Sequence, residues 1–283
     1  MRVLITGANG QLGQDVHKLC RKNHIDCIAA GSKDLDISRE SGVQPFVENN
    51  RVDVIVNCAA YNAVDLAETE WKKAYLVNGL GIRNLAVAAN ASGAVLVHFS
   101  TDYVFDGTAR VPYTIAESPR PISRYGMSKL LGETMVRDIA SHFILIRTSW
   151  VFGAGNDNFP KKILDWSKGK KELRVIDDQV ASPTYTVDLA AAALELIKKN
   201  GRGLFHVTNS GHCSRYDWAK HILDACGWEG ILVRGKSDEF PTAAKRPAFS
   251  ALDNFGTPEA LGYSLPGWKD ATERFLKELE VIP

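Results

Sequence analysis

The chain has 283 residues, of which 45% are hydrophobic, and its 34 basic and 33 acidic residues give a formal net charge of +1. This length allows a large buried core in one elaborated domain or two compact ones, and the balanced charge does not favour a nucleic acid or an anionic membrane as the main partner. The five cysteines are odd in number and contain no CxxC pair, which argues against a disulfide framework or a zinc site.

In the first half of the sequence, apolar strand-like runs alternate with helix-length segments. The predicted strands are at 3–6, 27–30, 54–58, 95–100 and 143–147. The predicted helices are at 11–22, 42–49, 78–92 and 125–140. Strands that alternate with helices indicate a parallel sheet that is buried on both faces, which explains why these runs are apolar throughout. We therefore predict an α/β fold with a doubly wound, Rossmann-like sheet.

After Trp150 this alternation breaks down. The predicted elements there are helices at 156–168, 187–199, 216–226 and 270–279 and short strands at 173–176 and 204–207. We interpret this part as a smaller, discontinuous C-terminal substrate lobe. The predicted dinucleotide-binding domain comprises residues 1–151 and 184–209, and the predicted substrate-binding lobe comprises 152–183 and 210–283.

A glycine-rich turn follows the first strand directly and leads into a helix. Its GxxGxxG spacing lets the backbone turn tightly and approach a pyrophosphate, while the helix N-terminus offers free N–H groups. The bare pattern is also compatible with an ordinary strand-to-helix turn, but its place between a strand and a helix favours a dinucleotide site. The predicted cofactor contacts in this turn are Gly7, Asn9, Gly10, Gln11, Leu12 and Gly13.

The end of the second strand bears on the choice of cofactor. NAD sites usually carry an acidic residue there, whereas this strand ends at Ala30 with no carboxylate at its tip. Ser32 and Lys33 are suited to a 2′-phosphate, so we expect NADPH to be preferred over NADH, although Lys33 is equally compatible with a solvated loop charge. Asp36 and Ile37 are placed to reach the adenine.

A second run, at 230–237, formally matches the GxxxxGK[ST] phosphate loop. A working phosphate loop follows a strand and opens a helix, but here Ile231 to Val233 is itself strand-like and the chain soon reaches Pro241. We therefore reject a nucleoside triphosphatase. The seven histidines show no metal-ligand spacing, so no metal site is predicted.

Tyr125 and Lys129 lie four residues apart near the start of a predicted helix and therefore share one face. A lysine ammonium beside a phenol lowers the pKa of the phenol, which suits it for proton transfer near neutral pH. A YxxxK pair alone is also compatible with a surface helix turn. The position of Thr101 favours a catalytic role for the pair, because Thr101 ends a central strand at the edge where open parallel sheets bind ligands.

Longer runs carry a family resemblance over nearly the whole chain. The chain resembles the dTDP-4-dehydrorhamnose reductases of the extended short-chain dehydrogenase/reductase superfamily in TGANGQLG, NCAAYNAVDLAE, STDYVFDG, YGMSKLLGE, RTSWVFG, DDQVASPTYTVDLA and KRPAFSALD. The resemblance implies reduction of the C4 ketone of dTDP-4-dehydrorhamnose, a dTDP-4-keto-6-deoxy sugar, to dTDP-L-rhamnose with NAD(P)H.

The same resemblance implies roles for individual residues. The catalytic places fall on Thr101, Tyr125 and Lys129. The sugar is expected at Asp102, Tyr103 and Trp150, and the nucleotide end of the substrate at Arg246. The residues that flank the cofactor are Asn57, Cys58, Ala59, Ala60, Tyr61 and Asn78, together with Tyr125 and Lys129. Trp150 also fits an interdomain core position, and Arg246 a surface arginine whose stem covers apolar side chains.

Two other functions share this fold. A nucleotide-sugar epimerase or dehydratase would keep the YxxxK pair, but Asp102 follows Thr101 without an adjacent glutamate, which disfavours the dehydratase. A non-catalytic NADP-binding regulatory subunit, such as the methionine adenosyltransferase beta subunit, also resembles this family. The intact Thr101, Tyr125 and Lys129 argue against that alternative.

The sequence also bears on assembly and location. Some family members form a dimer that shares a magnesium ion through glutamates, but this chain has Asp15 at the first of those places and no convincing full set. Monomer and homodimer, and any role for Mg²⁺, therefore stay open. We expect a nucleotide-sugar partner, no nucleic acid and no membrane. No charged leader and no apolar run of about 18 residues precedes the first strand, so a cytoplasmic protein is expected.

Overall fold

The computed structural model describes residues 1–283, and a six-stranded parallel sheet lies at its centre. The strands are β1 (Arg2–Thr6), β2 (Asp26–Ala30), β3 (Val54–Asn57), β4 (Val95–Thr101), β5 (Phe143–Thr148) and β10 (Gly203–His206). They lie in the order β2, β1, β3, β4, β5, β10, and every neighbouring pair is parallel. This confirms the predicted doubly wound sheet, whose strand order reverses between β1 and β3.

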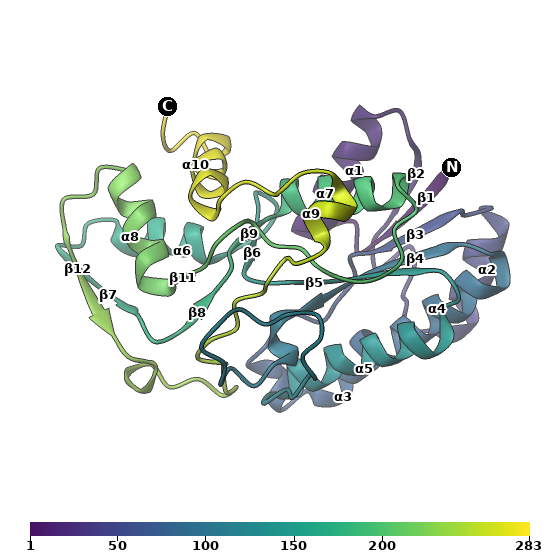
Figure 1. Ribbon diagram of the computed structural model, residues 1–283, viewed down its shortest axis with the longest axis horizontal. Helices are drawn as coiled ribbons and strands as arrows, with labels where there is room; N and C mark the ends of the chain where they lie inside the picture. The colour runs from purple at the N-terminus through teal and green to yellow at the C-terminus, as the bar shows by residue number, and fades with distance from the viewer.

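Helices cover both faces of the sheet (Figure 1). One face carries α1 (Gln11–Lys22) and α7 (Thr186–Lys198), and the other carries α2 (Glu40–Asn49), α4 (Gly81–Ser92) and α5 (Arg124–Ile139). Successive strand residues point to opposite faces, so Val3 and Ile5 pack beneath α1 and α7, whereas Leu4 packs beneath α2 and α4. Because both faces are buried, the strands are apolar without alternation.

The segment before α4 differs from the prediction of one helix at 78–92. The structure instead has η1 (Leu66–Glu68), α3 (Trp71–Tyr75) and a π-helical turn, η2 (Leu76–Leu80), before α4 begins. Asn78 lies in the π turn, where its side-chain amide accepts from the N–H of Tyr61 and donates to the carbonyl of Tyr61. Single π turns inside helices often occur at functional sites, and this one fixes the loop after β3.

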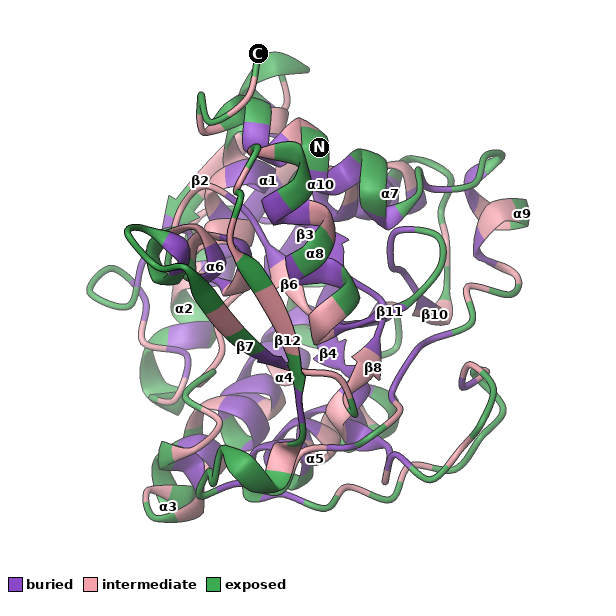
Figure 2. Cartoon of the chain, turned by 90° about the vertical axis from the view of Figure 1, so that its left-hand side faces the viewer, coloured by how far each residue is buried: buried purple, intermediate pink, exposed green.

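The C-terminal part forms a smaller lobe with its own aromatic core. α6 (Phe159–Ser167), α8 (Arg215–Ala225) and α10 (Trp268–Glu278) pack around Phe152 and Trp218. Its two-stranded pairs are β6 (Val151–Phe152) with β9 (Thr184–Tyr185), β7 (Glu172–Ile176) with β12 (Ile231–Gly235), and β8 (Val180–Ala181) with β11 (Cys213–Ser214). Both strands of the outer ribbon, β7 and β12, carry exposed residues among less exposed ones (Figure 2).

The GxxxxGK[ST] run forms β12 and then only a three-residue turn, η4 (Ser237–Glu239), which confirms that it is not a phosphate loop. The short helix α9 (Thr257–Leu261) packs against α7, so it lies with the sheet, and the division of the chain into the two units given above stays a proposal. None of the helices combines the length and the apolar character needed to cross a membrane.

Candidate active site

The glycine turn brings the N-terminus of α1 to the carboxyl end of β1. Gly7 has a φ of 62°, and a Cβ at this position would lie 2.5 Å from the backbone nitrogen of Ala59. A Cβ at Gly13 would lie 2.4 Å from the carbonyl oxygen of Gly7. No side chain caps α1, because its N-cap residue is Gly10, so the first-turn N–H groups remain free for a ligand. These features form a close-fitting cradle for an anion at the switch point of the sheet.

The cradle opens into a cavity of about 350 Å³ at the ends of β3 and β4, which we call the catalytic cavity. The predicted residues that line it are Gly10, Gln11, Leu12, Asn57, Cys58, Ala59, Ala60, Thr101, Asp102, Tyr103, Tyr125, Lys129 and Trp150. The structure therefore brings the glycine turn, the Thr/Tyr/Lys set and the predicted sugar residues to one place. Gln11 also has a buried side-chain oxygen without a hydrogen-bond partner, which leaves an acceptor available for a ligand.

The catalytic set comes from two elements whose ends are fixed locally. Thr101 ends β4, and its hydroxyl accepts from the N–H of Tyr103 at 3.1 Å. The hydroxyl of Ser123 caps α5 by accepting from the N–H of Gly126 at 3.1 Å. This cap sets the first turn of α5, from which Tyr125 packs edge-on against Tyr103 with ring centres 5.7 Å apart.

The pKa values of Tyr125 and Lys129 on α5 are shifted in a way that the sequence does not predict. The ammonium of Lys129 donates to the carbonyl of Phe99 at 2.6 Å, and burial lowers the pKa of Lys129 to about 8. Burial raises the pKa of Tyr125, and the charge of Asp102 raises it further. The prediction that Lys129 lowers the pKa of this phenol is therefore wrong for this structure, because burial dominates. A phenol that stays protonated at neutral pH is suited to donate a proton.

Asp102 begins the short turn η3 (Asp102–Val104) and is buried beside Thr101. Burial raises the pKa of Asp102 to about 6, against the opposing effect of its hydrogen bonds. The hydroxyl of Ser250, from the C-terminal part of the chain, donates to the Asp102 carboxylate at 2.5 Å. A carboxylate that titrates near neutral pH therefore lies in the wall of the catalytic cavity.

Behind the catalytic residues lies a fully buried ion pair. The guanidinium of Arg147 on β5 contacts both oxygens of Glu133 on α5, at 2.9 and 2.8 Å. The hydroxyl of Ser100, the residue before Thr101, donates to the same carboxylate at 2.6 Å. Glu133 lies one turn after Lys129, and its charge opposes the loss of the Lys129 proton by raising that pKa. This network ties α5 to β4 and β5 directly behind the cavity.

Other predicted cofactor residues position the cavity wall without lining it. Asn78 holds the backbone of Tyr61 and also donates to the hydroxyl of Ser128 on α5 at 3.0 Å. The hydroxyl of Tyr61 donates to Glu70 at 2.9 Å. Asn78 thus joins the loop after β3 to the helix that carries Tyr125.

The loop after β2 contains a carboxylate that the sequence interpretation overlooked. Asp34, four residues after the strand ends, accepts from the N–H of Gly31 at 2.9 Å. Ser32 and Lys33 are exposed on this loop. Ile37 is buried in the core beneath α4. The predicted 2′-phosphate residues, Ser32 and Lys33, are thus open to solvent, with the carboxylate of Asp34 beside them.

Two other predicted cofactor residues lie near this loop. The carboxylate of Asp36 accepts from the N–H and the hydroxyl of Ser38, and Asn9 lies close to Gly31.

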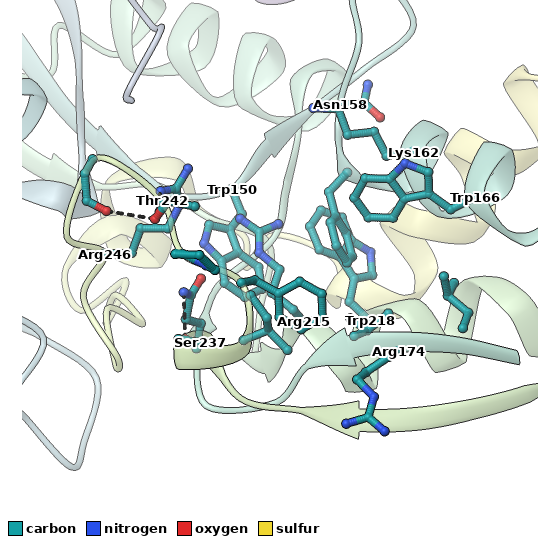
Figure 3. A pocket seen from close by; sticks show the side chains of 18 of the residues that line it. Trp150, Asn158, Lys162, Trp166, Arg174, Arg215, Trp218, Ser237, Thr242 and Arg246 are labelled. Carbon is teal, nitrogen blue, oxygen red and sulfur yellow. Dashed lines mark hydrogen bonds between the residues drawn. The ribbon is translucent and has the colours of Figure 1, made fainter. Parts of the chain in front are cut away.

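A second, larger cavity of about 1480 Å³ lies in the smaller lobe, and we call it the lobe cavity (Figure 3). Seven basic and three acidic side chains line it, which favours an anionic ligand. Arg246 is among them, but its guanidinium contacts both oxygens of Asp65, at 3.1 and 2.8 Å, and the hydroxyl of Thr242. Trp150, Val151 and Arg215 line both cavities.

Trp150 has a positive φ of 41° and stacks on Trp218, with ring centres 5.8 Å apart and planes 7° apart. The guanidinium of Arg215 lies 3.5 Å from the centre of the Trp150 ring. Sequence reasoning missed Arg215, and also Asn62, whose side-chain oxygen lies 3.5 Å from the hydroxyl of Tyr125. Asn62 lies within the NCAAYNAVDLAE run and was within reach of that signal, whereas Arg215 has no local signal.

Asp15, which stands at the first of the expected magnesium-binding places, contacts other side chains of the same chain. Its carboxylate accepts from the hydroxyl of Thr186 on α7 at 2.6 Å and pairs with Lys18 at 3.3 Å. No group of three or more histidine, cysteine, aspartate or glutamate residues is arranged to hold a metal ion. Asp15 therefore serves the packing of α1 against α7.

Comparisons with known proteins agree with this geometry. The family model of the RmlD substrate binding domain matches residues 1–281. The spore coat polysaccharide biosynthesis protein SpsK of Bacillus subtilis is 39% identical over 98% of this chain and 97% of its own. A dTDP-4-dehydrorhamnose reductase of Clostridium acetobutylicum superposes with a TM-score of 0.96 at 39% identity, covering 99% of this chain and 100% of that one. The dTDP-4-dehydrorhamnose reductase of Bacillus anthracis, solved in complex with NADP, gives 0.94 at 38% identity, covering 98% and 99%.

Proposed function

The chain belongs to the RmlD substrate binding domain family, and on this premise we propose that it is a dTDP-4-dehydrorhamnose reductase. The proposed reaction reduces the C4 ketone of dTDP-4-dehydrorhamnose to give dTDP-L-rhamnose, with NADPH as the preferred reductant. Relatives and solved structures bearing that enzyme name match nearly the full chain, which supports the assignment.

The single observation that carries the proposal is the composition of the catalytic cavity. An uncapped helix N-terminus after a glycine turn lies with Thr101, Tyr125 and Lys129 around one cavity. Glycine at positions 7 and 13 lets the turn and the start of α1 pack closely against the chain's own backbone, as the tight turn of a dinucleotide-binding loop requires. When bound, the nicotinamide supplies the hydride that reduces the sugar carbonyl carbon.

The side chains of this cavity have distinct roles in the proposed reaction. Tyr125, protonated because burial raises its pKa, donates the proton to the C4 oxygen as negative charge develops there. The hydroxyl of Thr101 donates a second hydrogen bond to the same oxygen, which stabilises that charge. Lys129, whose charge is fixed close to Phe99, supplies a positive field and orients the nicotinamide ribose.

The substrate is expected to span the two cavities through their shared wall. The sugar fits the catalytic cavity, beside Asp102, Tyr103 and Trp150. The nucleotide fits the lobe cavity, whose basic lining suits a diphosphate and whose tryptophan and phenylalanine side chains offer faces for a base. Arg246 lies in that lining and contributes to nucleotide binding either directly or by holding its loop.

The test is a steady-state assay with enzymatically prepared dTDP-4-dehydrorhamnose, in which oxidation of NADPH and of NADH is followed and the product is identified by nuclear magnetic resonance. We expect stoichiometric oxidation of the cofactor and formation of dTDP-L-rhamnose. NADPH binding without oxidation would indicate a non-catalytic subunit. Isomerisation of a nucleotide sugar without net oxidation would indicate an epimerase. Either result contradicts the proposal.

A further inference from the structure

Arg215 lines both the catalytic cavity and the lobe cavity, and Figure 3 shows its side chain among the residues of the lobe cavity. Arg215 is the first residue of α8, and its position is set by the neighbouring Ser214, which caps the helix in a reciprocal capping box with Asp217. Its backbone N–H donates to the carbonyl of Gln179 at 3.2 Å. The backbone that carries this arginine is therefore fixed before any ligand binds.

Aromatic rings hold the side chain in place. The guanidinium lies 3.5 Å from the centre of the Trp150 ring and 4.7 Å from that of Phe159. An arginine stacked on an aromatic face keeps its outward N–H groups available in the plane of the fork. The stack thus presents the donors of Arg215 to the cavity while it limits the motion of the side chain.

Arg215 differs from the other two arginines that line the lobe cavity. Arg174 pairs with Glu239 at 2.7 Å, and Arg246 pairs with both oxygens of Asp65. Arg215 forms no ion pair and no side-chain hydrogen bond; Asp102 acts on it only through its charge. Burial lowers the pKa of Arg215 to about 10, so the group still carries its charge at neutral pH. A partly buried cation without an ion-pair partner is stabilised by an anion with several acceptor oxygens.

We propose that Arg215 is the principal anchor for the diphosphate of the nucleotide sugar, an inference that rests on the proposed function. Its position between the cavities matches the chemistry of such a substrate, in which the diphosphate joins the sugar to the nucleoside. The sugar in the catalytic cavity and the base in the lobe cavity would then lie on opposite sides of Arg215. Arg246, whose fork is already engaged by Asp65, holds the loop that closes the lobe cavity.

The experiment measures the Kd of thymidine 5′-diphosphate, thymidine 5′-monophosphate and thymidine by calorimetry, in the wild-type protein and in Arg215→Met, Arg215→Lys and Lys220→Met. We expect Arg215→Met to weaken the binding of thymidine 5′-diphosphate by about 10- to 100-fold and the binding of thymidine by less than about 2-fold. Arg215→Lys keeps the charge without the planar fork, so its loss should be intermediate. Lys220→Met, the control, removes an exposed cation of the same helix that lines neither cavity, and it should bind all three ligands nearly as the wild type does.

The thermal midpoint and the Kd of NADPH are measured in each variant to show that the fold is retained, and Arg215→Lys serves in place of Arg215→Met if the latter does not fold. Unchanged diphosphate binding in a folded Arg215 variant overturns the inference, as does an equal loss for thymidine. If the wild type turns over the keto sugar in that case, the proposed function still stands. Diphosphate binding that depends on Arg215, in a wild-type protein that reduces no keto sugar, would instead overturn the proposed function alone.

Discussion

The ammonium of Lys129 and the carbonyl oxygen of Phe99 lie 2.6 Å apart, which fixes the lysine charge two residues before Thr101 ends β4. Because burial lowers the pKa of Lys129 to about 8, this group loses its proton as the pH rises through that value. The pKa of Tyr125 is raised, so the phenol keeps its proton over the same range. We therefore expect kcat/KM to fall above about pH 8, because Lys129 loses its positive charge there.

On the acid side, the dependence of kcat/KM on pH should reflect the titration of Asp102. Burial raises its pKa to about 6, so the carboxylate is charged above that pH and protonated below it. If the charged form accepts hydrogen bonds from the sugar hydroxyls, kcat/KM falls as the pH drops through about 6. The measurement is log kcat/KM against pH for the wild type and for Asp102→Asn, because this parameter reports groups of the free enzyme. An acid limb that persists unchanged in Asp102→Asn would remove this carboxylate from the account.

The Glu133–Arg147 pair predicts a large loss of stability on removal of one charge. Both side chains are fully buried, and Glu133→Gln leaves the Arg147 guanidinium without its counter-charge. Breaking a buried pair in this way costs about 3–5 kcal/mol. The free energy of unfolding in urea should fall by that amount. Asp224→Asn, which removes an exposed pair with Lys220, is the control and should change it little. Comparable small losses in both variants would show that the buried pair contributes no more than a surface one.

Cofactor preference is tested at the loop after β2. Lys33 is exposed on this loop, so its interaction with a 2′-phosphate is screened by solvent. Lys33→Ala should therefore weaken the binding of NADPH by only about 2- to 5-fold. NADH lacks this phosphate, and its Kd should stay unchanged. Lys22→Ala removes an exposed charge at the far end of α1 and should leave both cofactors unaffected. Equal losses for NADPH and NADH in Lys33→Ala would show that this residue does not discriminate between them.

Arg246 connects the C-terminal loop to the loop after β3 through Asp65. Arg246→Ala removes this contact and a cation of the lobe cavity, so we expect KM for the nucleotide sugar to rise about 10-fold while kcat changes little. Asp65→Asn keeps the arginine charge and tests the loop contact by itself. If KM for the sugar and Kd for NADPH both stay at wild-type values in Arg246→Ala, the diphosphate is held without any help from this residue.

What the sequence could predict depended on whether the signal was local. The bounds of α1 were predicted as observed, because its apolar spacing and its glycine turn lie in one short stretch. The contact between Asp65 and Arg246 joins residues 181 positions apart, and no pattern in either segment indicates it. The pKa of Tyr125 was mispredicted for a related reason. The YxxxK spacing places the two side chains on one face, but the burial that dominates the pKa comes from packing of distant elements.

The most direct test of the central claim is the kcat of Tyr125→Phe with dTDP-4-dehydrorhamnose, measured together with its Kd for NADPH. The substitution removes only the phenolic hydroxyl, which is the proposed proton donor and lines the catalytic cavity beside Thr101. We expect kcat to fall by about 10² to 10⁴ while NADPH binding and the thermal midpoint stay near wild type. A variant that turns over the keto sugar at nearly the wild-type rate would contradict the proposed role of Tyr125.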